Sequence, residues 1–364
     1  MSNSVNIRGV ALVKSPLQFL NALEACHHFG LSPQECLLVL MADRKSLPQL
    51  QALLTLSPPW GGVVPLVSSG LNPGIEPYDV GRFKRHPLWG NDIFGIVKLA
   101  NLASRLVSLE VVLIGDLENA LMRHFAQRAR ADKVVVMDDG VATLRYAAWR
   151  VDGARAGRPR LSKRVGSALK HWVFGLRDTY PSQLTFFSVY DVTLPEQDCL
   201  EKNDYGYLRK SIQEVPVDDV IYVLGGPLVE AEILTESEYL WHLEAMAREL
   251  DGQRVVYVAH RRESPERVSQ LGKHLGWQTC LFDYPIEFQL AVVGPRPRIL
   301  VSLLSSALEN CSRLFGEQLP IRSYRLSRDH FAAHGTPRGA EIKALYAHYT
   351  DLQTTHFKVC DLEA

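Results

Sequence analysis

At residues 134–143 the chain reads Val134-Val-Val-Met-Asp138-Asp139-Gly140-Val-Ala-Thr143. The apolar, largely β-branched residues that open this segment predict a buried strand. Two carboxylates and a glycine follow, and ligands of an open parallel sheet bind outside the carboxyl ends of its strands. Successive strand side chains point in opposite directions, so Asp138 and Asp139 can face one ligand only if the turn at Gly140 redirects one of them. A second interpretation stays open, in which Asp-Asp-Gly is a surface turn with a helix cap.

The composition indicates a folded protein large enough for two domains. The 364 residues are 46% hydrophobic, and 40 Lys plus Arg balance 40 Asp plus Glu. Balanced charge gives no overall field that attracts nucleic acid, and no apolar run reaches the roughly 18 residues of a membrane span. The N-terminus lacks the layout of a signal peptide, and six scattered cysteines without a Cys-x-x-Cys pair indicate neither disulfides nor zinc. We therefore expect a soluble, cytoplasmic protein with reduced cysteines.

Strands and helices alternate along the first half of the chain. The pattern predicts strands at 9–13, 35–41, 61–67, 109–114 and 134–137, and helices at 16–28, 45–56, 92–107 and 117–130. Ser15 fits the N-cap of the first of these helices, and Pro16 fits its first position. Repeated βα alternation predicts a parallel sheet covered on both faces.

A second α/β half begins near Val217. Its predicted strands are 218–224, 254–258, 278–282, 298–304 and 320–324, and its predicted helices are 236–250, 264–275, 287–292 and 307–315. A polar segment near 195–215 fits a hinge. We expect an α/β protein with two Rossmann-like domains, 1–200 and 201–335, facing each other across a cleft. Residues 336–364 are expected to form helices that pack back on the first domain.

In the second half, polar groups follow the predicted strands. They are Gly225-Gly226, then His260 with Arg261, then Glu287, then Ser305-Ser306. Glycines allow backbone amides to approach a ligand, and paired serines at a helix N-terminus favour a phosphate. Histidine and arginine can hydrogen-bond phosphate oxygens, and an acid can accept from a ribose hydroxyl. Each of these groups, taken alone, has an ordinary structural explanation. Because the four groups follow successive predicted strands, together they predict a nucleotide-phosphate site. No carboxylate cluster for a metal accompanies it.

A basic segment separates the two halves. Residues 153–177 contain seven cations and no acid: Arg155, Arg158, Arg160, Lys163, Arg164, Lys170 and Arg177. One interpretation is a solvated insert. The other is an amphipathic segment that contacts an anionic membrane, at the inner face of the cell membrane, or a polyanionic acceptor. Nucleic acid is not expected, because the overall charge is balanced.

Several motifs together resemble a known group of enzymes. The opening Ser15-Pro16-Leu-Gln18-Phe-Leu-Asn-Ala-Leu-Glu-Ala25 resembles that of bacterial sialyltransferases and polysialyltransferases of glycosyltransferase families 52 and 38. The acidic-acidic-Gly, His-Pro and paired-serine motifs of these families look like Asp138-Asp139-Gly140, His260-Arg261 and Ser305-Ser306, in that order. The chain departs from the second motif, because Arg261 stands where the families have proline.

The resemblance implies a GT-B fold and an inverting, metal-independent transfer of a nonulosonic acid (sialic acid or a relative) from a CMP-activated donor to a hydroxyl of a cell-surface glycan. The CMP-sugar would be a co-substrate, with no further cofactor. By similarity, Gly225 and Glu287 would hold cytidine and ribose, and Ser15, Pro16 and Gln18 would line the floor of the cleft.

The residues themselves suggest how that transfer would proceed. Asp138 or Asp139, with Asp139 preferred because it adjoins Gly140, would act as general base. His260 would protonate or hydrogen-bond the leaving phosphate, and Ser305 and Ser306 would hold its oxygens. Three alternatives remain: a phosphate-ester hydrolase, which would need a magnesium cluster, a non-catalytic sugar-nucleotide or glycan-binding module, and a transferase that uses another donor such as CMP-Kdo.

Overall fold

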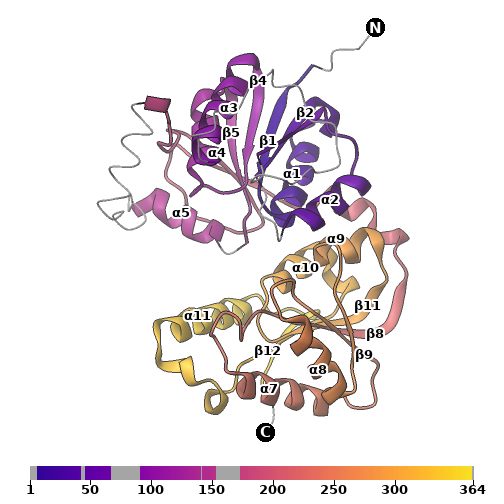
Figure 1. The fold of residues 1–364 in the computed structure, drawn as a ribbon. Coiled ribbons are helices and arrows are strands. Elements are labelled where there is room, and N and C mark those ends of the chain that lie inside the picture. The colour runs from indigo at the N-terminus through magenta and orange to yellow at the C-terminus, as the bar shows by residue number, and fades with distance from the viewer. Residues whose placement is uncertain (1–5, 42–45, 67–90, 141, 153–172, 363–364) are drawn as a thin grey trace. The chain divides into compact units, whose positions relative to one another are not determined.

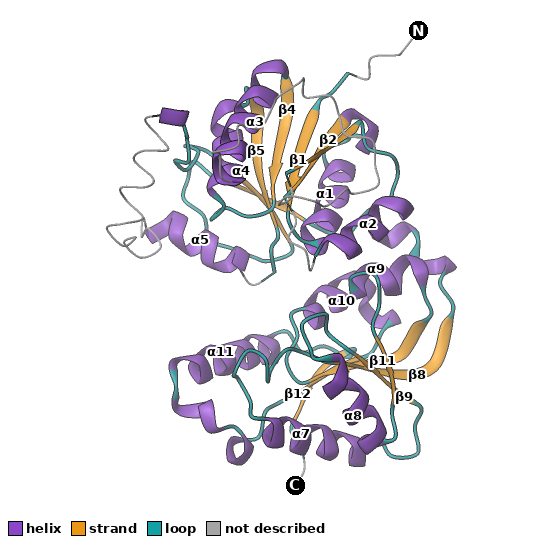
Figure 2. Cartoon of the chain, viewed as in Figure 1, coloured by secondary structure: helices purple, strands orange, loops and turns teal. Residues whose placement is uncertain are grey.

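The computed structural model describes residues 6–41, 46–66, 91–140, 142–152 and 173–362. The chain forms two compact units, Met1–Tyr207 and Leu208–Ala364, and each contains one parallel sheet flanked by helices (Figures 1 and 2).

The first unit is built on a seven-stranded sheet. Its spatial order is β3-β2-β1-β4-β5-β6-β7, and every pair is parallel. The strands are β1 (Gly9–Val13), β2 (Cys36–Leu40), β3 (Gly62–Pro65), β4 (Leu109–Ile114), β5 (Ala131–Met137), β6 (Thr185–Ser188) and β7 (Cys199–Lys202). The first six strands thus follow the 3-2-1-4-5-6 order of the Rossmann fold, whose ligand site lies where the order reverses, between β1 and β4.

Helices cover both faces of this sheet. They are α1 (Pro16–His28), α2 (Leu47–Leu56), α3 (Asn91–Arg105), α4 (Ala120–Arg128) and α5 (Ala142–Asp152). The pair α1 and α2 and the pair α3 and α4 lie on opposite faces (Figure 1). The alternate residues Val10 and Leu12 of β1 join the core under α3 and α4, together with Leu99 and Phe125. Burial on both faces explains why these strands read as continuous apolar runs.

The second unit repeats this plan. Its sheet has the order β10-β9-β8-β11-β12-β13, again all parallel and again 3-2-1-4-5-6 in chain order. The strands are β8 (Val217–Leu224), β9 (Val255–Val258), β10 (Gln278–Cys280), β11 (Arg296–Ser302), β12 (Ile321–Tyr324) and β13 (Phe357–Cys360). The α-helices are α7 (Glu236–Glu249), α8 (Pro265–Leu275), α9 (Ile286–Phe288, continued by a π-turn over Gln289–Val293), α10 (Ala307–Phe315) and α11 (Pro337–Asp351). The predicted two-domain, Rossmann-like α/β class is confirmed.

Three strands were missing from the sequence prediction. The strands β6 and β7 complete the first sheet, and β7 lies in the segment 195–215 where the sequence indicated a hinge. The division between the units falls after Tyr207 rather than after residue 200. The helix expected after residue 336 is present as α11, but the chain then forms strand β13, which pairs with β12 in the second sheet and was not predicted. All three strands have only four residues, and β7 (CLEK) and β13 (FKVC) include charged residues, so no continuous apolar run marks them.

Most of the basic segment, residues 153–172, lies outside the described residues. Six of its cations therefore have no structural account: Arg155, Arg158, Arg160, Lys163, Arg164 and Lys170. Among the helices that the structure describes, none combines the length and apolar character needed to cross a membrane.

The placement of β13 generates a stability prediction. Phe357 of β13 is 1% exposed and packs edge-to-face on Tyr349 of α11, whereas Lys358 beside it is exposed. We expect Phe357→Ala to lower the free energy of unfolding by about 3–5 kcal/mol, as for other buried phenylalanines, and Lys358→Ala to change it by less than about 0.5 kcal/mol. Urea denaturation followed by circular dichroism measures both. Equal effects would contradict the strand assignment.

Candidate active site

The carboxyl ends of the central strands of the first sheet meet at one level. Leu12 of β1 pairs with Ile114 of β4, which in turn pairs with Val136 of β5. The residues two positions further on, Lys14, Asp116 and Asp138, therefore leave neighbouring strands side by side. Lys14 and Asp116 flank the point where the strand order reverses, which is the expected ligand position of this fold.

The two acids of the Asp-Asp-Gly motif have different surroundings. The carboxylate of Asp138 is buried and accepts hydrogen bonds from Ser188 Oγ at 2.6 Å and from the Val189 N–H at 2.7 Å. Asp138 therefore ties the end of β5 to the end of β6. Gly140 has a φ of 62°, a left-handed conformation that favours glycine. Asp139 is half-buried beside it and has its carboxylate near Tyr146.

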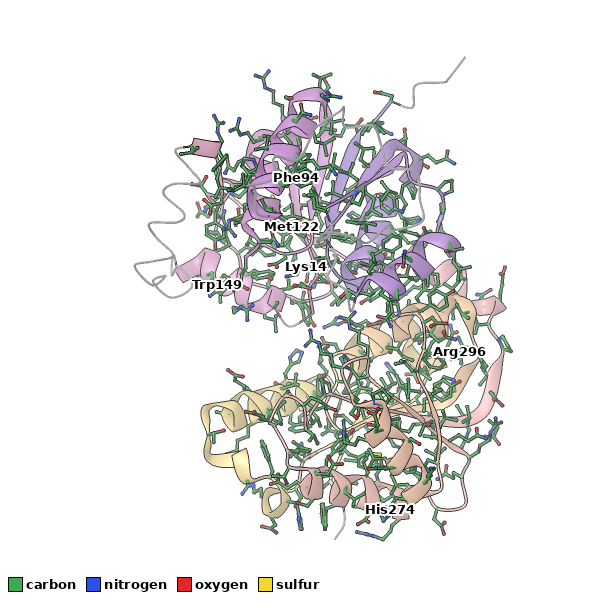
Figure 3. All side chains as sticks on the ribbon, in the orientation of Figure 1. Lys14, Phe94, Met122, Trp149, His274 and Arg296 are labelled. Carbon is green, nitrogen blue, oxygen red and sulfur yellow. The ribbon has the colours of Figure 1, made fainter. Side chains whose placement is uncertain are left out.

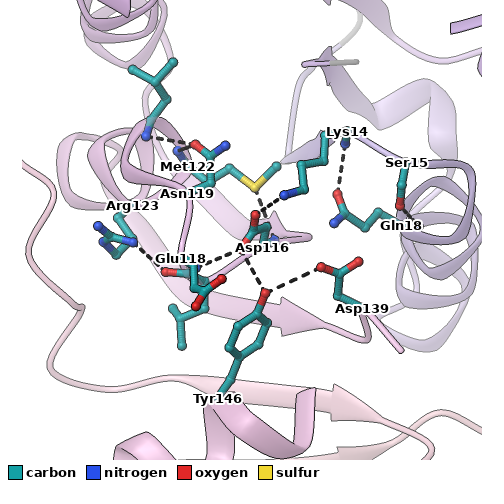
Figure 4. A network of polar contacts seen from close by, with 12 residues as sticks. Lys14, Ser15, Gln18, Asp116, Glu118, Asn119, Met122, Arg123, Asp139 and Tyr146 are labelled. Atoms are coloured by element: carbon teal, nitrogen blue, oxygen red, sulfur yellow. Dashed lines mark hydrogen bonds and ion pairs between the residues drawn. The ribbon is translucent and has the colours of Figure 1, made fainter. Parts of the chain in front are cut away.

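Asp139 belongs to a polar network with Lys14, Asp116 and Tyr146 (Figure 4). Tyr146 Oη lies 2.9 Å from Asp116 Oδ1 and 3.5 Å from Asp139 Oδ2, so one hydroxyl proton serves two carboxylates. Lys14 Nζ forms an ion pair with the buried Asp116. The Asp116 N–H donates to Met122 Sδ at 3.3 Å, and Met122 and Lys14 lie in the same part of the unit (Figure 3).

The network shifts the pKa values of Asp116 and Asp139 in opposite directions. Burial alone would raise the pKa of Asp116, but the Lys14 ammonium and the hydrogen bonds from Tyr146 and from the Glu118 N–H outweigh it and lower that pKa. Burial raises the pKa of Asp139, the nearby Gln18 amide opposes this, and the negative charge of Asp116 adds to the rise. A carboxylate with a raised pKa is a stronger general base.

The residues predicted at the start of α1 form the beginning of that helix. Ser15 is its N-cap, with Oγ accepting from the Gln18 N–H at 3.3 Å, and Pro16 is its first residue, as predicted. Gln18 is fully buried, and its Oε1 accepts from the Lys14 N–H at 2.9 Å. Its Nε2 lies near Asp139 but makes no hydrogen bond to any described residue. A side chain at Gly115 would collide with Gln18, which explains the glycine there.

In the second sheet, the strands that carry predicted donor residues also end in register. Leu224 of β8 pairs with Val258 of β9 and with Ser302 of β11. Gly225-Gly226, His260 and Ser305-Ser306 therefore follow three adjacent strands at one edge. The reversal of strand order lies between β8 and β11, where Ser302 Oγ donates to the Leu224 carbonyl at 2.9 Å.

Gly225 has a structural reason to be glycine. A Cβ there would collide with Tyr257 Oη and with Glu263, whereas a Cβ at Gly226 would meet nothing closer than 3.6 Å. Tyr257 Oη donates to Glu263 Oε1 at 2.6 Å. The contact of these glycines with a donor nucleotide stays a prediction.

His260 lies on the same buried network. Its N–H donates to Glu263 Oε2 at 2.6 Å, and its Nδ1 accepts from the Arg262 N–H at 3.2 Å. The neutral ring therefore carries its proton on Nε2. Burial and the charges of Arg261 and Arg262 lower the pKa of His260 to about 4. At neutral pH, His260 is thus an uncharged hydrogen-bond donor.

The paired serines open α10. Ser305 Oγ accepts from the Ala307 N–H at 3.3 Å, whereas Ser306 is exposed and its side chain makes no capping bond. The exposed Ser306 hydroxyl and the dipole of the helix favour an anion at this end of α10, as the sequence predicts.

The sequence predicts that Glu287 contacts a ribose, but its side chain is buried inside the second unit. It is 5% exposed and accepts from Asn310 Nδ2 at 2.9 Å, so it links α9 to α10 inside the unit. Burial raises the pKa of its carboxyl group. A contact with ribose stays a prediction.

Sequence reasoning missed several residues of these networks. Lys14 directly follows β1 and Asp116 comes two residues after β4, so both could have been found by the criterion that selected Asp139. Glu263 is only three residues from His260, but Tyr146 and Tyr257 lie inside a helix and a strand and carry no sequence signal. Among the residues that the structure describes, no group of three or more His, Cys, Asp or Glu could hold a metal ion.

No protein-family model matches the chain, and no curated protein matches its sequence. Among solved structures, it is similar to an α/β-galactoside α-2,3-sialyltransferase from Photobacterium phosphoreum (10% identity, TM-score 0.47, covering 97% of this chain and 98% of that one). It is also similar to MurG from Acinetobacter baumannii (10% identity, TM-score 0.42, covering 98% of this chain and 86% of that one). A third similar structure is a UDP-GlcNAc 2-epimerase from Methanocaldococcus jannaschii (11% identity, TM-score 0.43, covering 93% of this chain and 91% of that one). At such low identities and TM-scores these similarities say nothing about substrate.

The two acids should respond differently to substitution. Asp138→Ala leaves the buried donors of Ser188 and Val189 unpaired, and we expect it to lower the free energy of unfolding by about 3 kcal/mol. The pKa of Asp139 lies above its ordinary value of 3.8, so its ionisation above that pH disfavours the folded state. At pH 7, Asp139→Asn should therefore be neutral or stabilising by up to about 1 kcal/mol. Chemical denaturation at pH 7 measures both, and a large loss for Asp139→Asn would contradict the proposed arrangement.

The protonation of His260 is directly measurable. We expect its imidazole to titrate at about pH 4 in the free protein, and CMP to raise that pKa by a unit or more, because a phosphate favours the charged ring. Between pH 6.5 and about 4 the unfolded chain binds a proton that folded His260 does not, so His260 lowers stability as pH falls and His260→Gln reduces that loss. Histidine-labelled NMR with and without CMP tests this. A titration near pH 6.5 that CMP leaves unchanged would show that the ring is solvated and distant from the phosphate.

Proposed function

We propose that the chain is an inverting glycosyltransferase that moves a nonulosonic acid from a CMP donor to a hydroxyl of a glycan acceptor. The observation that carries the proposal is the separation of the Asp-Asp-Gly carboxylates: Asp138 is used in the structure of the first unit, and Asp139 is left with a raised pKa beside a shared tyrosine hydroxyl. The choice of donor comes from the sequence resemblance.

In this proposal the first unit supplies the base. The acceptor hydroxyl transfers its proton to Asp139 as its oxygen bonds to the anomeric carbon of the donor sugar. The carbon–oxygen bond to phosphate breaks on the opposite face, which inverts the configuration. As Asp139 becomes neutral, Tyr146 can donate wholly to Asp116, so the network keeps a partner for its one shared proton.

The second unit would bind the departing CMP. Its phosphate would gain negative charge as the bond to the sugar breaks, and donors that are already oriented stabilise such charge. The Nε2–H of neutral His260 and the Ser306 hydroxyl are donors of this kind, and the dipole of α10 adds to them. In this arrangement the leaving phosphate is stabilised by hydrogen bonds rather than by a full proton transfer from His260.

The decisive experiment is release of CMP from a CMP-nonulosonate, such as CMP-N-acetylneuraminate, with and without glycan acceptors. We expect turnover that persists in EDTA and falls by about 10²–10⁴-fold in Asp139→Ala and in His260→Ala, the usual range for acid–base groups. The matched control is Asp132→Asn, which removes an exposed carboxylate from β5, the strand that precedes Asp139.

Each other outcome has a definite meaning. Full activity in both variants would show that the reacting groups are misassigned. Tight CMP binding without turnover for any acceptor would favour a non-catalytic binding module. Turnover with CMP-Kdo alone would retain the mechanism and change the sugar.

A further inference from the structure

A pocket in the second unit lies outside the residues assigned so far. It has a volume of about 300 Å³ and lies between the chain that follows β12 and one face of α11. The α11 residues that line it are Ile342, Lys343, Tyr346, Ala347 and Thr350, whose spacing places them on a single helix face. The volume is at the lower end of the range for small-molecule sites.

All the charged residues that line this pocket are cations. Arg325, Arg328 and Lys343 line it, and no acidic residue does. Arg325 is held in place, because its guanidinium donates to Thr350 Oγ1 at 2.8 Å and forms an ion pair with Asp361. Arg328 and Lys343 are exposed and form no hydrogen bond or ion pair with the part of the chain that the structure describes. Two cations are thus available to an incoming anion.

The rest of the lining is apolar and already ordered. Leu326, Phe331, Ile342 and Tyr346 are each less than a tenth exposed. Tyr346 Oη donates to the carbonyls of Leu303 and Tyr324, at 2.8 and 3.2 Å, so its ring is fixed. An inorganic anion would leave this apolar surface and most of the volume unused, and a purely apolar ligand would leave the cations unused.

The helix that lines the pocket also contacts the turn before α10. Tyr349 Oη of this helix, α11, donates to the Ser305 carbonyl at 2.8 Å. The pocket residues Arg325 and Leu326 directly follow β12, the strand next to β11. The pocket therefore lies at the carboxyl edge of the sheet, where this fold binds ligands.

We propose that this pocket binds a sugar that carries a carboxylate or a phosphate. The anionic group pairs with Arg328 and Lys343 beside the fixed Arg325, and the C–H face of the ring covers the apolar residues. This site is separate from the one assigned to the donor phosphate and does not depend on transferase activity.

The test uses the full chain and probes that differ in one group. Glucuronate, glucose 6-phosphate and glucose share a ring, whereas acetate and inorganic phosphate supply the anions alone. By calorimetry and saturation-transfer NMR, we expect at least one anionic sugar to bind at least tenfold more tightly than glucose and than its own bare anion. The stronger of the two identifies the anion. Equal binding of glucose, or no binding of either anionic sugar, overturns the proposal.

Substitutions of the lining residues test whether the anionic sugar binds in this pocket. Arg328→Gln and Lys343→Gln should each weaken binding about tenfold, the effect of losing one charged hydrogen bond. Ala347→Phe, on the exposed side of α11, should block the pocket with all charges intact. Lys273→Gln removes an exposed cation from α8 and is the matched control. Unchanged binding in Ala347→Phe or in the Arg328→Gln, Lys343→Gln double variant contradicts the proposal.

A final comparison separates this site from the donor site. Saturating CMP should not displace the anionic sugar, and His260→Ala should leave sugar binding unchanged. Competition by CMP, or loss of sugar binding in His260→Ala, would place the sugar at the donor residues and overturn the proposal of a second site. If the chain released no CMP from a CMP-nonulosonate, the proposed function would fail. None of these sugar-binding measurements would change in that case.

Discussion

The register of parallel strands is the constraint on which both sets of candidate residues depend. In each unit, three neighbouring strands end at the same level, so short segments that are far apart in the chain emerge side by side. Because helices cover both faces of each sheet, a shift of register by one residue would exchange the side chains that fill the two cores, and close-packed cores do not tolerate that exchange. The cores therefore fix the register, and the register fixes which polar residues meet.

Within the first unit, burial determines what each carboxylate can do. Asp138 is surrounded by donors that stabilise its charge, and it closes the turn between two strands. Asp139 is partly desolvated, shares a tyrosine with Asp116 and is repelled by that charge. The energetic cost of holding an ionised carboxylate there is also what makes it a better base, a trade between stability and reactivity that is common at active sites.

In the second unit, a buried network determines the tautomer of the half-buried His260. Glu263 holds the backbone of His260, and the Arg262 amide occupies Nδ1, so the proton of the neutral ring points away on Nε2. Two adjacent arginines disfavour a further positive charge on the ring. This arrangement suits hydrogen bonding to an anion, with the arginines adding to the local positive potential.

The sequence alone determined the α/β class, the alternation of most strands and helices, the start of α1 at Ser15-Pro16 and the strand ends that carry Asp139, His260 and Ser305-Ser306. These features are local, because apolar periodicity, cap residues and turn residues act within a few positions. Only the tertiary structure decided that Asp138 is a structural group, that Gly225 makes room for Tyr257 and Glu263, that Glu287 is buried against Asn310, and that β13 returns to the second sheet. It also decided that Lys14, Asp116 and Tyr146 surround Asp139. Each of these outcomes depends on a contact between segments that are separated along the chain, and such contacts exist only once the strands have paired and the side chains between them have lost water.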